Sequence, residues 1–148
     1  NRNLPLVTDK LCETLLNDGI KQSDLFVLEA GSDEGNISSY CTWHVRDADT
    51  MRNGLRYNRG MNQALINLFQ SPKWDDYDAY LLLTNDTVFQ SEQPIQKLAN
   101  ILEKHPRVAM LSPSSKYWGE NNLISKNSEK YSEIDQTTTE DELTGKNF

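Results

Sequence analysis

Hydrophobic residues along the chain fall into two patterns, one with helical spacing and one with short continuous runs. Apolar side chains three and four positions apart predict amphipathic helices over residues 4–18, 58–70 and 94–104. Pro5 suits the first turn of the first helix, and Gly19 suits its end. Pro72 and Pro106 follow the other two helices, and the residue before a proline disfavours the helical conformation.

The continuous apolar runs predict strands that are buried on both faces. They lie at residues 25–28, 79–83 and 108–111, and a further strand is expected within 40–45. Strands that alternate with helices predict an α/β fold, with a doubly wound, mostly parallel sheet and helices on both faces. Only residues 1–3 precede the first helix, so we expect the strand that would feed it to be missing from the chain or to lie before it.

Two regions of different composition follow one another. Residues 1–113 carry the helical and apolar patterns and are predicted to form one α/β domain. Residues 114–148 are rich in Ser, Asn, Thr and Glu, with scattered apolar side chains. They predict an irregular segment, or the start of a second region.

Composition narrows the function classes. The chain has 148 residues and a formal charge of −7, which argues against nucleic-acid binding because that function needs a basic face. No apolar stretch is long enough to span a bilayer, and no secretory signal is visible. Cys12 and Cys41 show no metal-site spacing. Free thiols in a cytoplasmic protein are favoured over a disulfide, because a domain of this size needs no covalent staple.

Two carboxylates follow predicted strands. Glu29 ends one strand, where it could accept a hydrogen bond from the imide N–H of uracil or thymine, or could simply start a loop. Asp86 follows Thr84 and Asn85 at the end of another. Ligands of open α/β sheets bind beyond the carboxyl ends of the strands, so Asp86 could hold a divalent cation that bridges to a diphosphate. The alternative is that Asp86 starts a turn.

Arginines gather before the predicted helix at 58–70. Four of them lie within fourteen residues, namely Arg46, Arg52, Arg56 and Arg59. Arginine forks and helix N-termini both suit phosphate oxygens, although a solvated basic face is the alternative. The acidic residues 75, 76 and 78 precede a predicted strand and so belong to its amino end, where we expect a solvated turn.

Five segments share an order and spacing with one enzyme family. They read Asn-Arg-Asn-Leu at 1–4, Phe-Val-Leu-Glu-Ala-Gly-Ser-Asp-Glu-Gly at 26–35, Asn-Arg-Gly at 58–60, Leu-Leu-Thr-Asn-Asp at 82–86 and Pro-Arg-Val-Ala-Met-Leu-Ser-Pro at 106–113. Together they resemble the nucleotide-binding half of a family 2-type glycosyltransferase with the GT-A fold. The matching family features are the end of the first strand, V-V-D-N-G-S-x-D-G, the N-x-G helix entry, D-x-D and P-x-V-G-x-V-G-P.

The resemblance implies a function and a set of site residues. The implied activity is transfer of a sugar from a UDP- or dTDP-linked donor to a saccharide or lipid-linked acceptor, assisted by Mn²⁺ or Mg²⁺. A lipid-linked acceptor would allow peripheral association with the inner membrane face. The implied metal ligand is Asp86, and the implied nucleotide-binding residues are Glu29, Gly31, Ser32, Arg56, Asn58, Arg59 and Asn85.

The chain departs from the family pattern at three points. Thr84 stands where the first motif Asp is expected, and Glu29 is one methylene longer than the Asp that recognises the base. The family's catalytic base belongs to the acceptor half, which we expect to lie beyond the end of this chain, so no catalytic residue is nominated.

Two other functions remain open. One is a non-catalytic binding module or remnant with the same fold. The other is a nucleotidyltransferase, which the lack of a Gly-rich, Lys-bearing phosphate loop disfavours. The glycosyltransferase hypothesis requires Glu29 and Asp86 to face a common crevice that is open to solvent.

Overall fold

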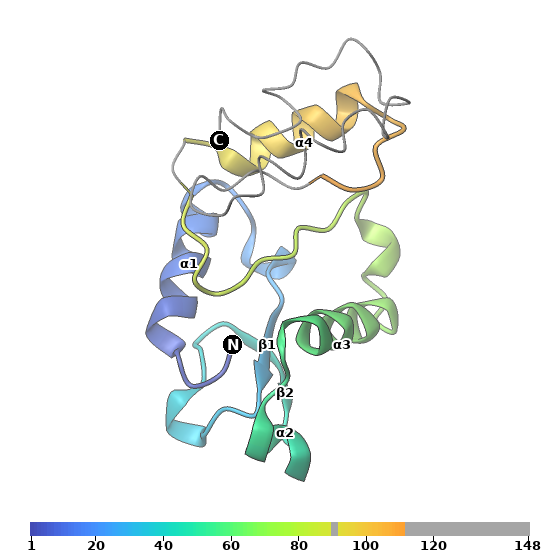
Figure 1. Cartoon of the computed structure of the whole chain (residues 1–148). Coiled ribbons are helices and arrows are strands. Elements are labelled where there is room, and N and C mark those ends of the chain that lie inside the picture. Colours follow the sequence, from blue (N-terminus) through green and yellow to red (C-terminus); the bar gives the residue numbers. More distant parts are fainter. Residues whose placement is uncertain (90–91, 112–148) are drawn as a thin grey trace, which may run out of the picture. The chain divides into compact units, whose positions relative to one another are not determined.

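The computed structural model describes residues 1–89 and 92–111, and the chain forms two compact units, Asn1–Val88 and Phe89–Phe148. In the first unit the helices and strands are α1 Pro5–Asn17, β1 Val27–Ala30, β2 Cys41–Val45, α2 Ala48–Asn53 and α3 Tyr57–Phe69 (Figure 1). In the second, α4 spans Pro94–Lys104. The α/β class is confirmed. The boundary between the units falls inside the predicted 1–113 domain, and the predicted irregular segment 114–148 lies outside the described residues.

The predicted helix at 4–18 is confirmed as α1, with a different buried face. Thr8, Cys12 and Leu15 are buried, whereas Leu4, the first apolar residue of the predicted helix, is 53% exposed. Leu4 is the residue before the first turn, so it lies outside the packed stripe. At the other end, Gly19 has a φ of 95° and its N–H donates to Leu16 O, which closes the last turn as the sequence predicts.

The sheet consists of β1 and β2, which pair in parallel, with an irregularity in register between Val27 and Leu28. On its other side β1 meets Asn1: the Asn1 N donates to Leu28 O at 2.7 Å, and the Ala30 N donates to Asn1 O at 2.8 Å. These two bonds form one rung of a parallel ladder between Asn1 and Glu29. The start of the chain is therefore aligned with β1 as a parallel strand would be.

Helices lie on both sides of these strands. α3 packs against β1, and Figure 1 shows α1 on the other side. Leu28 and Ala30 of β1 and Leu68 of α3 are buried in the core. The predicted helix at 58–70 is confirmed as α3, although Phe69 at its end is 65% exposed.

The short helix α2 was not predicted from the sequence, because six residues are too few to show a helical period. Its N-cap is Asp47, whose carboxylate accepts from the Thr50 N–H at 3.0 Å. At its other end the Arg2 guanidinium donates to Met51 O at 3.0 Å and to Arg52 O at 3.2 Å. Arg2 thus satisfies carbonyls that a helix end leaves without partners.

The predictions of strands at 79–83 and 108–111 are wrong, because both segments are described and neither pairs as a strand. A strand needs a row of partner groups, and in the described part of the chain only Asn1 pairs its backbone with the outer side of β1. The apolar side chains in these segments are also not buried: Leu81 and Leu82 are each 44% exposed and Met110 is 88% exposed.

In the second unit, the predicted helix at 94–104 is confirmed as α4. Pro94 occupies its first turn, and Leu98 and Ile101 are buried at a spacing of three residues. His105 ends the helix, as the following proline predicts.

We predict that Gly31→Ala destabilises the protein by about 2–4 kcal/mol. Gly31 has a φ of 77°, and a Cβ at this position would lie 2.2 Å from Thr50 O, so an alanine is strained and also collides with α2. Urea unfolding measures the loss.

Gly35→Ala is the matched control, because a Cβ there meets nothing within 4 Å. Its stability should stay within about 0.5 kcal/mol of the parent chain. Equal stability of the two variants would contradict the close packing of β1 against α2.

Candidate functional site

Glu29 lies at the carboxyl end of β1 and is fully buried, with 0% of its surface exposed. Its Oε1 accepts from the Ser38 N–H at 2.8 Å, and its Oε2 accepts from the Ser32 hydroxyl at 2.5 Å. The Asn1 side-chain amide donates to both oxygens at 3.0 Å. A buried carboxylate is tolerated only when donors surround it in this way.

The donors to Glu29 are themselves anchored. The Ser32 hydroxyl accepts from the Asn3 N–H at 3.0 Å, and the Ser38 hydroxyl is hydrogen-bonded to Asp9 of α1 at 2.5 Å. The loop between β1 and β2 is therefore fastened at both ends. Asn1 and Ser38 were not predicted as site residues, because no local sequence pattern marks a residue that completes a polar cluster formed by distant segments.

The 84–86 segment reaches the same end of the sheet. The Asn85 amide nitrogen donates to Asn1 Oδ1 at 3.1 Å and to Thr8 Oγ1 at 3.4 Å. Of the predicted site residues, Ser32 thus bonds directly to Glu29, and Asn85 is joined to Glu29 through Asn1. Gly31 lies beside them, at the end of β1.

Asp86 is exposed and lies in a turn that is closed by the Thr87 N–H donating to Thr84 O at 3.1 Å. Glu29 is not exposed, so the two carboxylates do not line a common solvent-filled crevice as the hypothesis requires. A base could contact the Glu29 carboxylate only if one of its present hydrogen bonds opened.

A metal could be held here only with help from a ligand. Within residues 1–89 and 92–111, no three His, Cys, Asp or Glu side chains come together in a way that could bind a metal ion. Asp86 offers a single carboxylate, which fits a Mg²⁺-type ion that keeps its waters and brings phosphate oxygens with it. The residues present do not fit a metal site made by protein alone.

The predicted phosphate-binding residues lie at the start of α3. Arg56 is its N-cap residue, without a side-chain capping bond, and Arg56, Asn58 and Arg59 are all exposed. Arg59 forms an ion pair with Asp49 at 3.4 Å. Within the described residues no hydrogen bond or ion pair joins these three residues to Glu29 or Asp86, so they form a separate exposed group.

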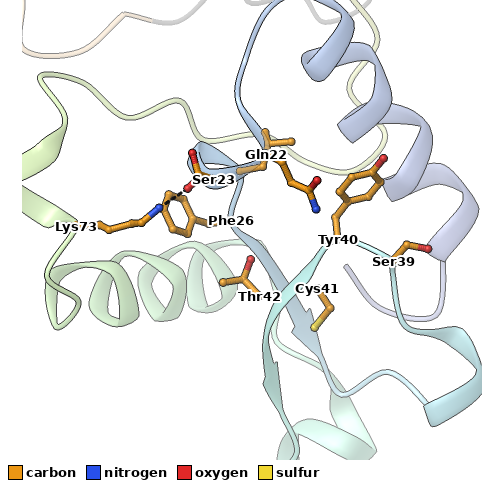
Figure 2. A pocket seen from close by; sticks show the side chains of 9 residues that line it. Gln22, Ser23, Phe26, Ser39, Tyr40, Cys41, Thr42 and Lys73 are labelled. Carbon is orange, nitrogen blue, oxygen red and sulfur yellow. Dashed lines mark hydrogen bonds between the residues drawn. The ribbon is translucent and has the colours of Figure 1, made fainter.

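The groove shown in Figure 2 lies at the opposite end of the sheet, beside the amino ends of β1 and β2. It has a volume of about 480 Å³ and is lined by residues that include Gln22, Phe26, Tyr40, Thr42 and Lys73. The Lys73 ammonium donates to Ser23 O at 2.6 Å and lies 5.6 Å from the centre of the Phe26 ring. None of the predicted site residues lines this groove.

Both cysteines are free thiols. Burial raises the pKa of the Cys12 thiol to about 11, with the charge of Asp9 adding to the effect. Burial, and then the negative charge of Glu29, raises the pKa of Cys41. Nucleophilic cysteines need a lowered pKa, so neither thiol suits covalent catalysis.

Comparisons with protein-family models, with curated proteins and with solved structures return no match to this chain. None of the helices in the described part is long and apolar enough to cross a membrane.

We predict that the stability supplied by Asp47 is lost in acid. Hydrogen bonds from the Thr50 hydroxyl and then from the Thr50 N–H lower the pKa of Asp47 below its ordinary value of 3.8. A lowered pKa stabilises the fold fully above the unfolded-state pKa, and the contribution disappears as the pH falls through the folded-state pKa. Asp47→Ala should therefore be less stable than the parent chain at pH 6, and the difference should shrink below pH 3.8 in urea titrations.

Asp47→Asn is the matched control, because asparagine still offers an acceptor oxygen to α2 but does not titrate. A difference between the parent chain and Asp47→Ala that is constant from pH 6 down through the acid range would contradict the carboxylate cap.

Proposed function

We propose that this chain is the nucleotide-sugar-binding half of a glycosyltransferase with a doubly wound, GT-A-like sheet. One observation carries the proposal: three segments far apart in sequence, residues 1–3, 29–32 and 84–86, meet at the carboxyl end of β1. This is the end at which open α/β sheets bind ligands. Asn1 lies parallel to β1 on the side away from β2, as the end of a first strand would.

The exposed carboxylate of Asp86 is the proposed contact for the donor. A Mn²⁺ or Mg²⁺ ion that arrives with the diphosphate would need only one protein carboxylate, with phosphates and waters as its other ligands. When bound, the ion stabilises negative charge on the departing nucleotide diphosphate. Arg56 and Arg59, exposed at the start of α3, are the proposed further contacts for phosphate oxygens.

The requirement that Glu29 and Asp86 share an open crevice is not met, so the proposal rests on Asp86 and the exposed arginines, and Glu29 takes a different part in it. Its carboxylate is buried and fully engaged, so we assign it to holding Asn1 and the loop after β1 in place. Ser32 is also buried, and its hydroxyl is used by Glu29 and Asn3. The donor would then meet backbone groups near Gly31 and the side chains of Asn85 and Asp86. A saccharide or lipid-linked compound is the proposed acceptor.

A non-catalytic binding module is the second candidate. Two observations favour it: Glu29 is closed off from solvent, and no metal-binding group of three side chains is formed within the described residues. Such a module could still bind a nucleotide sugar, or it could use its surface for protein contacts. A turnover assay separates the two candidates. If this chain transfers or hydrolyses a donor sugar, it is not a non-catalytic binding module.

We predict that UDP binds in the presence of Mn²⁺, and that Mn²⁺ alone and UDP alone bind far more weakly. The reason is that Asp86 offers one carboxylate and the protein carries a net charge of −7. Isothermal titration calorimetry measures the three affinities. Asp86→Asn should weaken binding of UDP with Mn²⁺ by about tenfold or more.

Asp78→Asn is the control, because Asp78 is also exposed but precedes the 79–83 segment. Its affinity should match that of the parent chain. Equal losses in both variants, or no binding of UDP with Mn²⁺ by the parent chain, would overturn the proposal. Tighter binding of UTP than of a UDP-sugar would favour a nucleotidyltransferase instead.

A further inference from the structure

We propose that Glu29 fixes the orientation of the Asn85 side chain by acting through Asn1. As a result Asn85 presents its Oδ1 to the ligand, and position 85 excludes a carboxylate. The orientation follows from hydrogen-bond polarity alone. Only the identification of the ligand-binding edge rests on the proposed function.

The hydrogen bonds that link Glu29 to Asn1 and Asn1 to Asn85 are called the relay below, and they start at an acceptor, the Glu29 carboxylate. A carboxylate has lone pairs but no proton to donate, and the groups that point at the Glu29 oxygens are all donors. The Ser38 N–H can only donate, and the Ser32 hydroxyl donates to Oε2. Asn1 must therefore turn its NH₂ group toward Glu29, as the two distances of 3.0 Å from its Nδ2 require.

The orientation of Asn1 determines that of Asn85. With the Asn1 nitrogen directed at Glu29, its Oδ1 faces the other way and needs a donor. The Asn85 Nδ2 fills this need at 3.1 Å. An oxygen in the same place would face the Asn1 oxygen, which has no proton to offer.

A second contact fixes the same orientation of Asn85. Its Nδ2 also donates to Thr8 Oγ1 at 3.4 Å, and the Thr8 hydroxyl uses its own proton for Leu4 O at 3.2 Å. Thr8 can thus act only as an acceptor toward Asn85. Both N–H groups of Asn85 are directed into the protein.

The carbonyl oxygen of Asn85 is left for a ligand. In the described part of the chain, the buried side-chain polar atoms without a partner are Arg2 Nε and His44 Nε2, so Asn85 Oδ1 is not enclosed. Next to it in sequence is the exposed carboxylate of Asp86. Both groups are acceptors, so a ligand that reaches them is favoured if it brings hydrogen-bond donors or a hydrated cation, and free phosphate is disfavoured.

The test compares two substitutions at one position. Asn85→Ala removes the donor and leaves Asn1 Oδ1 without this partner, whereas Asn85→Asp places oxygen against oxygen. We expect Asn85→Asp to lower the melting temperature by roughly 5–10 °C and to lower it more than Asn85→Ala does. Asn62→Asp, on the exposed side of α3, controls for the added charge and should change little.

A substitution that places a hydrogen-bond donor at position 29 tests the relay directly. In Glu29→Gln the new NH₂ group can donate to Asn1, which then turns its own NH₂ group toward position 85. The double variant Glu29→Gln with Asn85→Asp should therefore lose less than the sum of the two single losses, although the acceptor Thr8 Oγ1 still faces the new carboxylate. Additive losses in the double variant, or a smaller loss for Asn85→Asp than for Asn85→Ala, would overturn the proposal.

A measurement on the unaltered chain covers the case in which Glu29→Gln fails to fold. The side-chain NH₂ protons of Asn85 should exchange with solvent more slowly than those of the exposed Asn62 in NMR spectra, and equal exchange rates would contradict the relay. Failure of UDP binding would overturn the proposed function but not this orientation, because neither the melting series nor the exchange rates involve nucleotide.

Discussion

The buried carboxylate of Glu29 is the interaction on which the rest of the first unit depends. It lies where the chain start, the end of β1, the loop before β2 and the 84–86 segment converge, and its partners come from three of these four. The fourth, at Asn85, is reached through Asn1. A charge that is removed from water needs such a full set of donors, so the same group that is costly to bury also dictates how its neighbours must be arranged.

This constraint divides the polar residues of the region into two groups: those that hold the structure together and those that are free to contact the proposed ligand. Glu29 and Ser32 already form hydrogen bonds within the protein and are buried, so they could not also bind a nucleotide unless these bonds opened. Residues such as Asp86, Arg56 and Arg59 are exposed and can reach outward. A polar cluster at the end of a parallel strand can therefore resemble a binding site in sequence while its innermost members work as structure.

Helices were easier to predict from the sequence than strands. α1, α3 and α4 carry a helical period together with local end signals, and these act within one segment. A strand depends on its partners, and the apolar run at 79–83 finds no ladder in the described residues. The place of Glu29 and Ser32 at the carboxyl edge followed from the strand-end rule, because both belong to the end of β1 or follow it. Asn85 reaches the same edge through its bond to Asn1, without the strand that the sequence predicted before it. The burial of Glu29 did not, because it depends on Asn1 and Ser38, which are distant in sequence.

The turn at Glu34–Asn36 offers a practical use of these anchors. It projects between two fixed points: the Asp33 N–H donates to Asn3 Oδ1 at 2.8 Å before it, and Ser38 is tied to Glu29 and Asp9 after it. The turn is exposed, and Gly35 has open space around it. Lengthening a surface loop adds little closure entropy. A fluorophore or affinity handle inserted at this turn would report on the carboxyl edge of the sheet while leaving the buried network intact.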